Sequence, residues 1–427
     1  MTRNVHLDDL NRFLFHLLFL ILFLASGLAA MGACSSSGQQ ADTLADGGTT
    51  TGFTAPADPG PGGILFAASG ELLALTGYAF PPASDGDPVF VDGWQVDFTR
   101  LLVTIDKLTL SANPDFVPGD ESRTGALVAE VDGPWAIDLS RSDPRNLPGK
   151  GGPGEQAVPI AALGKQNRNG NQPFATDGTR YAFGFDVVPA VASALAVNLD
   201  AAAMSDYQQM VADQCTVLYV GTATFKGGTI PGHTDCNAGA YASWPSTVHF
   251  RLCFKSPTTY ANCQNPDNDP ARALAGEEHE RGIAFLAGQS VVGQVTIHTD
   301  HPFWDSVLHD SPAHFDQFAA RVLGPAADAG APSVTLEMTL GVDYTAYTDA
   351  LGRPLDWRYC IDPPTDVHPM LSGPMAFDPQ SVPHATGGDP ATGLRDYQDF
   401  ATYDQSTQGH LDSDGLCAVE RHYPSPP

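Results

Sequence analysis

The sequence predicts a mainly β protein, an antiparallel β-sandwich-like fold with one or two short helices, held together by disulfide bonds. Three observations predict this class. Apolar and polar residues alternate over many short segments, as they do in strands with one buried face. Glycine and proline are abundant, at 43 and 35 of 427 residues, which favours turns between short strands. Six cysteines beyond residue 200 form an even set, as disulfide pairing requires.

The expected strands follow one another along the chain. Apolar residues alternate from Trp94 to Leu110, and the alternation changes phase near Asp106 and Lys107, which predicts a β-bulge. Alternation also predicts strands over 135–139, 181–187, 248–254 and 334–342, and the apolar segment 71–80 is grouped with them.

Two segments have helical signals instead. Ser311 followed by Pro312 is a favourable helix start, and apolar residues recur at helical spacing over 315–322. The segment 201–212, with sequence AAAMSDYQQMVA, predicts a second helix.

The charge balance excludes one class of partner. The chain has 21 Lys and Arg against 49 Asp and Glu, a formal net charge of −28. A nucleic-acid-binding face must neutralise phosphates with basic side chains, so no nucleic-acid partner is expected. The acidic balance also disfavours electrostatic docking on anionic lipid.

The N-terminal segment is expected to be a targeting signal. An apolar run over 13–30 ends at Met31-Gly32-Ala33-Cys34, and Ser35 follows. This pattern resembles a bacterial lipoprotein signal, and the resemblance implies cleavage after residue 33, lipidation of Cys34 and export to the outer membrane. An uncleaved N-terminal membrane helix is the alternative.

The rest of the chain divides by composition. Residues 34–63 have few large apolar side chains and are expected to be the lipidated cysteine followed by a disordered tether. We expect β-rich domains over 64–200 and 201–361, and a loop-rich, disulfide-pinned tail over 362–427.

The cysteines beyond Cys34 are disulfide candidates. They are Cys215, Cys236, Cys253, Cys263, Cys360 and Cys417. Six cysteines allow 15 connectivities. Spacing favours Cys253 with Cys263 and Cys215 with Cys236, which leaves Cys360 with Cys417. A thiolate metal site is disfavoured because no C-x-x-C motif occurs.

The densest polar cluster predicts a metal site. His298, Asp300 and His301 follow an expected strand end, and Asp316 lies in the expected helix nearby. Imidazole suits zinc or copper, and carboxylates can complete such a site or orient a ring. His309 and His314 are reserve ligands. The alternative is a structural turn in which Asp300 and His301 cap the backbone.

The H-x-D-H-x-F stretch at 298–303 and the stretch Gly133-Pro134-Trp135-Ala136-Ile137-Asp138-Leu139 add a resemblance. Both are similar to segments of uncharacterised Gram-negative exported lipoproteins with β-sandwich domains. That family implies no established activity, but the resemblance favours joint action of His298, Asp300, His301 and Asp316.

Two acidic loops are candidates for calcium. Asn265, Asp267 and Asp269 alternate as calcium ligands do, but Pro270 stands where glycine is needed, and the loop 412–415 has no closing glutamate. Solvated turns explain both loops better.

The sequence thus supports three functions. The first is a surface or periplasm-facing lipoprotein that binds zinc or copper without being an enzyme. The second is a metal-free lipoprotein that adheres to a protein or glycan partner. The third is a metal-assisted hydrolase, although no G-x-S-x-G or Walker-type motif occurs and no catalytic residue is identified.

Overall fold

The computed structural model describes residues 53–84, 86–166, 172–228, 236, 239–306, 311–323, 330–362, 370–377, 394–408, 410–411 and 416–422. The expected signal segment 1–33 and Cys34 lie outside the described residues. The expected tether overlaps them at 53–63, which contain no strand or helix. There the Gly62 N–H donates to the carbonyl of Gln289 at 2.9 Å. The chain is therefore held against the folded part before its first strand begins.

Strands dominate the described residues, and the predicted mainly β class is confirmed. The strands are β1 (Ile64–Ser69), β2 (Trp94–Ala112), β3 (Leu127–Val131), β4 (Trp135–Asp138), β5 (Leu147–Pro148), β6 (Gln156–Leu163), β7 (Asp177–Val187), β8 (Leu195–Val197), β9 (Val217–Phe225), β10 (Thr247–Phe254), β11 (Thr258–Ala261), β12 (Ile283–Leu286), β13 (Val291–Thr296), β14 (Ser333–Thr335), β15 (His410–Leu411) and β16 (Ala418–Arg421).

The helices are short. The α-helices are α2 (Glu71–Thr76), α3 (Ala201–Asp213), α4 (Asp316–Ala319) and α5 (Tyr397–Gln405), and the 3₁₀ turns are η2 (Gly239–Ser243), η3 (Pro270–Arg272), η4 (His301–Phe303), η5 (Ala320–Val322) and η7 (Leu336–Thr339). Within the described part of the chain, no helix is long and apolar enough to span a bilayer.

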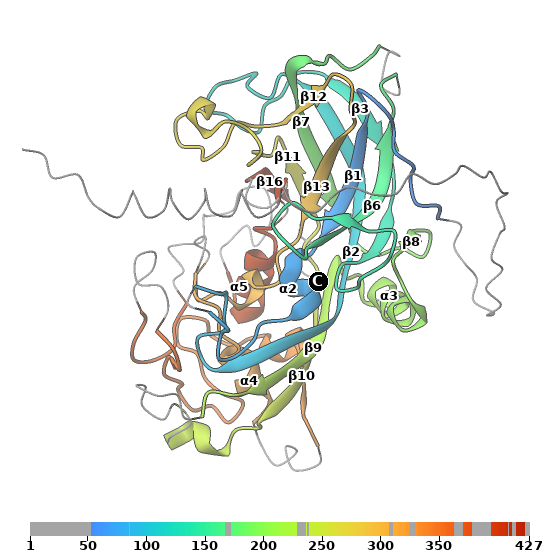
Figure 1. Cartoon of the computed structure of the whole chain (residues 1–427). Helices are drawn as coiled ribbons and strands as arrows, with labels where there is room; N and C mark the ends of the chain where they lie inside the picture. The colour runs from blue at the N-terminus through green and yellow to red at the C-terminus, as the bar shows by residue number, and fades with distance from the viewer. Residues whose placement is uncertain are drawn as a thin grey trace, which may run out of the picture. The chain divides into compact units, whose positions relative to one another are not determined.

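The strands form two sheets. The smaller has the order β15-β13-β1-β6-β5, and its strands β1, β6 and β13 run side by side in Figure 1. The larger follows the path β14-β10-β9-β2-β7-β11-β16, with β3, β4, β8 and β12 attached beside it. Most neighbours are antiparallel, but β1 with β13, β4 with β8 and β10 with β14 are parallel pairs. Phe66 of β1 and Phe183 of β7 stack at 5.9 Å between ring centroids, so one apolar core joins both sheets.

The long strand β2 carries the predicted bulge. Its register against β7 shifts between Asp106 and Thr109, and Lys107 has a φ of 46°. The one extra residue in β2 moves the side-chain alternation to the opposite face, which is the phase change visible in the sequence.

The expected boundary near residue 200 does not separate two sheets. In the larger sheet, β9 lies between β2 and β10, so strands from 64–200 and from 201–361 are direct neighbours. The strand β16 from the expected tail pairs with β11. Thr49–Pro427 accordingly form one compact unit, because hydrogen bonds across strands join segments that are distant in sequence.

Two expected helices are present, one of them shortened. The segment 201–212 forms α3, whose first turn is capped by the Asp200 side chain. The second helix does not start at Ser311. It begins at Asp316 as α4, because the Asp92 carboxylate accepts the free N–H groups of Phe315 and Asp316 at 2.6 and 2.7 Å.

Two expected strands are wrong or shortened. The segment 71–80 contains helix α2 instead of a strand. The segment 334–342 keeps only the strand β14, which pairs with β10 at the end of the larger sheet, and the chain then turns as η7. Beyond β14, Met338 and Leu340 are 42% and 64% exposed, so their alternation marks no buried face.

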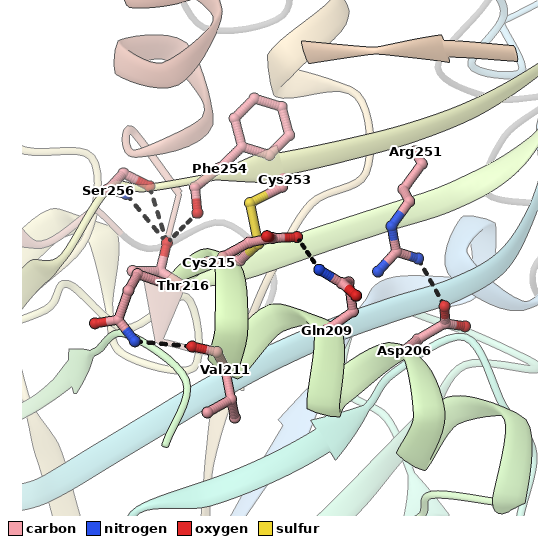
Figure 2. The surroundings of a disulfide bond; sticks show 11 residues. Asp206, Gln209, Val211, Cys215, Thr216, Arg251, Cys253, Phe254 and Ser256 are labelled. Carbon is pink, nitrogen blue, oxygen red and sulfur yellow. Dashed lines mark hydrogen bonds and ion pairs between the residues drawn. A yellow bond between two sulfur atoms is a disulfide. The ribbon is translucent and has the colours of Figure 1, made fainter. Parts of the chain in front are cut away.

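All three disulfides differ from the pairing that spacing favoured. The bonds are Cys215–Cys253, Cys236–Cys360 and Cys263–Cys417. Figure 2 shows the first, which joins the chain just after α3 to β10. The local pair Cys253–Cys263 fails because β11 intervenes: it pairs with β16 in a register that places Ala261 opposite Ala418, beside Cys417. Strand pairing thus outweighs sequence proximity.

Candidate metal site

The site lies where β13 ends. The Ile297 N–H donates to the carbonyl of Ser69 at 2.9 Å and continues the pairing of β13 with β1, and the chain then turns through His298, Thr299 and Asp300 into η4. In this turn His298, Asp300 and His301 each offer a ligand atom, and these atoms lie within 4.8 Å of one another. The two imidazole rings are 4.9 Å apart between centroids. The structure therefore brings together three of the four residues expected to act jointly.

His301 is held on two sides. It is 2% exposed, and its ring stacks on Trp304 with centroids 3.9 Å apart. Its Nδ1 lies 2.7 Å from the hydroxyl oxygen of Thr407, and that hydroxyl donates to the carbonyl of Asp404 at 2.7 Å. A hydroxyl has one hydrogen, so towards His301 the Thr407 oxygen is the acceptor and Nδ1–H of the imidazole is the donor. This tautomer leaves Nε2 as the ring nitrogen with the lone pair that a metal needs.

His298 is oriented by a carboxylate. Its Nδ1 lies 3.5 Å from Oε2 of Glu71, the first residue of α2, whose φ of 60° is left-handed. A carboxylate beside Nδ1 favours the proton on that nitrogen and directs Nε2 toward a metal. The carbonyl of His298 accepts from the hydroxyl of Tyr219 at 2.9 Å, which anchors the backbone of this turn to β9.

The turn is closed by backbone groups. The Phe303 N–H donates to the Asp300 carbonyl at 2.7 Å, and the Asp300 side chain makes no capping hydrogen bond to η4. The Thr299 hydroxyl lies 2.8 Å from that of buried Tyr78. Burial, followed by the charge of Asp300, raises the pKa of Tyr78 well above its ordinary value. Because the Asp300 carboxylate does not cap η4, the alternative interpretation, in which this side chain caps the backbone of the turn, does not apply to Asp300.

Asp316 does not join the group. Its carboxylate is buried in an ion pair with Arg358, whose Nε lies 2.8 Å from Oδ2. The indole N–H of Trp94 donates to Oδ1 of Asp316 at 2.9 Å. The guanidinium of Arg358 in turn lies over the ring of Tyr241 at 4.4 Å. Asp316 therefore lies outside the group of His298, Asp300 and His301, because a cation from 42 residues further on already pairs with its carboxylate.

The two reserve ligands, His309 and His314, do not join the group of His298, Asp300 and His301 in the part of the chain that the structure describes. His309 lies outside the described residues. His314 is fully buried, with Nε2 3.5 Å from Oδ2 of Asp305, and its ring packs against Trp357 at 4.9 Å. Burial lowers the pKa of His314, but Asp305 and the charge of Asp92 raise it more, and the net direction is upward. His314 therefore belongs to a buried acid–base cluster with Asp305 and Asp92.

Glu71 and Thr407, which contact the two imidazoles, have no signal in the sequence that marks them as part of a site. Neither lies near the His/Asp segment in sequence: Thr407 is 106 residues from His301. Glu71 follows an apolar strand, and no local pattern distinguishes it from a solvent-exposed acid. Only the pairing of β1 with β13 brings α2 to the end of β13.

A pocket of about 450 Å³ adjoins the site through Glu71. Its walls are mainly apolar side chains of α2 and the 79–88 loop, together with the glycine-rich loop at 151–153. Glu155 completes the lining, and its carboxylate accepts from Ser69 at 2.6 Å and from Gln294 at 2.8 Å.

The acidic loop at 265–269 forms turns. Asn265 Oδ1 accepts from the Asp267 N–H at 2.9 Å, Asp269 caps η3 through the Ala271 N–H, and Asp267 pairs with Lys150 at 2.6 Å. These contacts favour the solvated-turn interpretation over calcium. The loop 412–415 lies outside the described residues.

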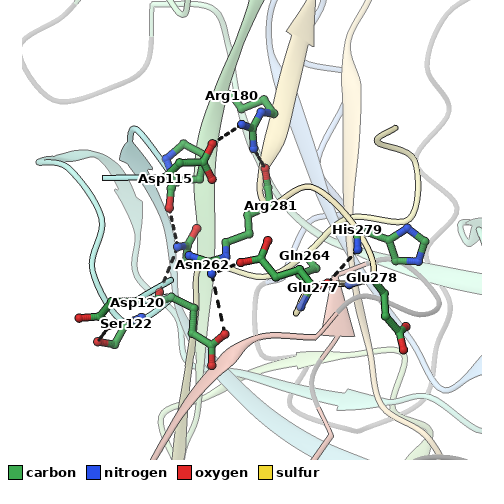
Figure 3. A network of polar contacts seen from close by, with 12 residues as sticks. Asp115, Asp120, Ser122, Arg180, Asn262, Gln264, Glu277, Glu278, His279 and Arg281 are labelled. Carbon is green, nitrogen blue, oxygen red and sulfur yellow. Dashed lines mark hydrogen bonds and ion pairs between the residues drawn. The ribbon is translucent and has the colours of Figure 1, made fainter. Parts of the chain in front are cut away.

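The acidic stretch after this loop is equally structural. The side-chain oxygen of Gln264 accepts the N–H groups of Glu278 and His279 at 3.0 and 2.9 Å, and Glu277 pairs with buried Arg281. Figure 3 shows these residues together. These contacts organise the chain between Cys263 and β12.

Comparisons with protein-family models, with curated proteins and with solved structures found no match for this chain.

Proposed function

We propose that this protein binds a transition metal ion, zinc or copper, through His298, Asp300 and His301, as a metal-binding or metal-handling protein. The observation that supports this function most directly is the convergence of two imidazoles and one carboxylate within 4.8 Å. Two histidines and a carboxylate suit zinc and copper(II).

The contacts around the rings favour the same chemistry. Glu71 beside Nδ1 of His298 and Thr407 beside Nδ1 of His301 orient both rings and select the tautomer that presents Nε2. Three protein ligands leave a fourth position for water or a small ligand on a tetrahedral ion. Protons compete with metal for imidazole, so affinity should fall as the solution is made more acidic.

Elemental analysis of the purified protein after equilibration with zinc or copper tests the proposal. We expect one ion per chain, removed by a chelator, and a large loss of uptake in the His298→Ala, His301→Ala double variant. His422→Ala is the matched control, because that histidine is half-exposed and its ring lies beside the Thr259 hydroxyl and the Glu420 carboxylate, outside the group of His298, Asp300 and His301. Substoichiometric metal, or uptake unchanged in the double variant, would contradict the metal site and favour the adhesion function.

We further propose that the protein is an exported lipoprotein anchored through Cys34, on the basis of the small residues before that cysteine and the Ser-rich segment after it. Mass spectrometry of the N-terminal peptide checks this. A lipid-modified N-terminal cysteine is expected, and an unmodified Cys34 within a longer N-terminal peptide would contradict it.

A further inference from the structure

Asp404 is a buried carboxyl group near the proposed metal site and is not one of the three proposed ligands. Asp404, near the end of α5, is 0% exposed, and neither of its carboxylate oxygens receives a hydrogen bond from the described residues. Other buried acids are partnered: Asp316 pairs with Arg358, and Glu155 accepts from Ser69 and Gln294. A buried carboxylate without hydrogen bonds is costly, so its retention requires a compensating group.

Asp404 is connected to the metal site. Its backbone carbonyl accepts a hydrogen bond from the Thr407 hydroxyl, and the oxygen of that hydroxyl lies 2.7 Å from Nδ1 of His301. The chain at the end of α5 therefore contacts His301 through Thr407, two residues beyond the helix, and Asp404 is linked to that contact by its backbone carbonyl.

The charges around Asp404 are mostly negative. Burial raises its pKa, the charges of Asp305 and Asp300 raise it further, and Arg421 acts in the opposite direction. Arg421 is engaged elsewhere, because its Nε donates to Ser406 at 2.6 Å and its guanidinium lies over the Tyr403 ring at 4.1 Å. A cation is the group that would compensate Asp300 and Asp404 together.

We propose that Asp404 supplies the buried negative charge that makes this site selective for a doubly charged ion over a singly charged one. The inference rests on the proposed metal site at His298, Asp300 and His301. Two neutral imidazoles suffice to bind a singly charged ion such as Ag⁺ or Cu⁺, since little charge needs compensation. A doubly charged ion such as Zn²⁺ needs more negative charge than Asp300 supplies. Asp404 adds to that charge, as does Glu71, which lies 3.5 Å from Nδ1 of His298, and in a low-dielectric site the added charge favours the doubly charged ion.

The ligand types agree with this selectivity. Soft ions such as Cu⁺ prefer thiolate and thioether ligands. The six described cysteines are all in disulfides, so they offer no thiolate. Carboxylate and imidazole together suit zinc and copper(II).

Titration calorimetry of the protein with Zn²⁺, and separately with Ag⁺ in chloride-free buffer, tests the proposal with Asp404→Asn. We expect Zn²⁺ affinity to fall about 10–100-fold, as for other groups that support a metal site, and Ag⁺ affinity to change by a much smaller factor. The matched control is Asp138→Asn, another buried aspartate with a raised pKa, which lies in β4 and accepts from Ser140. It should leave both affinities unchanged.

Thermal unfolding without metal shows whether Asp404→Asn folds. Because the substitution removes an uncompensated buried acid, its midpoint should equal or exceed that of the wild type, and zinc should raise the wild-type midpoint more than the variant's. Unchanged Zn²⁺ affinity, or equal losses for Zn²⁺ and Ag⁺, would overturn the role of Asp404 while leaving the metal site in place. Binding of neither ion by the wild type would overturn both.

Discussion

At the scale of single residues, the buried carboxyl groups around Asp92 are the feature that costs the most free energy to bury. Asp92 and Asp316 are both fully buried, and one arginine, Arg358, bonds to Asp316. The Asp92 carboxylate instead accepts two backbone N–H groups at the start of α4. Like charges close together in a buried site resist double ionisation, so the charge of Asp316 opposes the ionisation of Asp92.

The cluster predicts a pH-dependent stability. Burial, followed by the charge of Asp316, raises the pKa of Asp92 from 3.8 to about 7, against the opposing charges of His314 and Arg358. Between these two values the folded protein binds a proton more tightly than the unfolded chain, so stability falls as the pH rises through this window. Asp92→Asn should therefore show a smaller fall in unfolding free energy from about pH 4 to about pH 7, measured by urea denaturation.

A matched control uses an exposed carboxylate. The hydroxyl and N–H groups of Thr345 lower the pKa of Asp343, so this group titrates below the window. Asp343→Asn should keep the wild-type slope between pH 4 and 7, and an Asp92→Asn slope equal to it would contradict the assignment.

At the scale of elements, both ends of helix α3 are set by residues next to them in the sequence. Asp200 is the N-cap, with Oδ1 2.8 Å from the Ala203 N–H, and Gln214 ends the helix in a left-handed conformation with φ of 60°. The disulfide of Cys215 with Cys253 follows at once, so the helix end is tied to β10 (Figure 2). Ala203, Tyr207 and Met210 form the buried face of the helix.

Removal of the cap should destabilise the protein. Asp200→Ala leaves an N–H of the first turn without its acceptor and should lower the unfolding free energy by about 1 kcal/mol. Asp200→Asn keeps an acceptor oxygen and should lose less. Gln209→Ala, which removes only an exposed contact to Asp213, should change stability by less than about 0.5 kcal/mol. Equal losses for Asp200→Ala and Gln209→Ala in urea denaturation would argue against the cap.

At the scale of the whole molecule, the disulfides join segments that are distant in sequence. Cys263 and Cys417 are 154 residues apart, and their bond holds β16 on the edge of the larger sheet beside β11. The bond Cys236–Cys360 spans 124 residues. These long loops indicate that the disulfides stabilise tertiary pairing more than local turns.

Peptide mapping under non-reducing conditions checks this arrangement. We expect cross-linked peptides for Cys215–Cys253, Cys236–Cys360 and Cys263–Cys417. The Cys263→Ser, Cys417→Ser double variant should lose about 2–5 kcal/mol of stability. A Cys253–Cys263 peptide as the main product would contradict the pairing of β11 with β16.

The candidate site was predictable in part. His298, Asp300 and His301 are so close in sequence that one turn at a strand end suffices to bring them together. Asp316 was assigned to the same site because it is near in sequence, but Arg358 determines its role. Glu71 and Thr407 could not be found, since each comes from an element whose position depends on strand order.

The sequence by itself determined the mainly β class, the phase change in β2, helix α3 and the even set of cysteines. The first three depend on side-chain alternation and helix capping, which involve a few neighbouring residues, and the cysteine count is read from the sequence directly. Only the tertiary structure decided which cysteines pair, that strands from both halves share one sheet, and that Asp404 is buried and linked to His301 through Thr407. Those outcomes depend on long-range strand pairing and shared burial, whose free energy is spread over the whole core and leaves no periodic signal in any one segment.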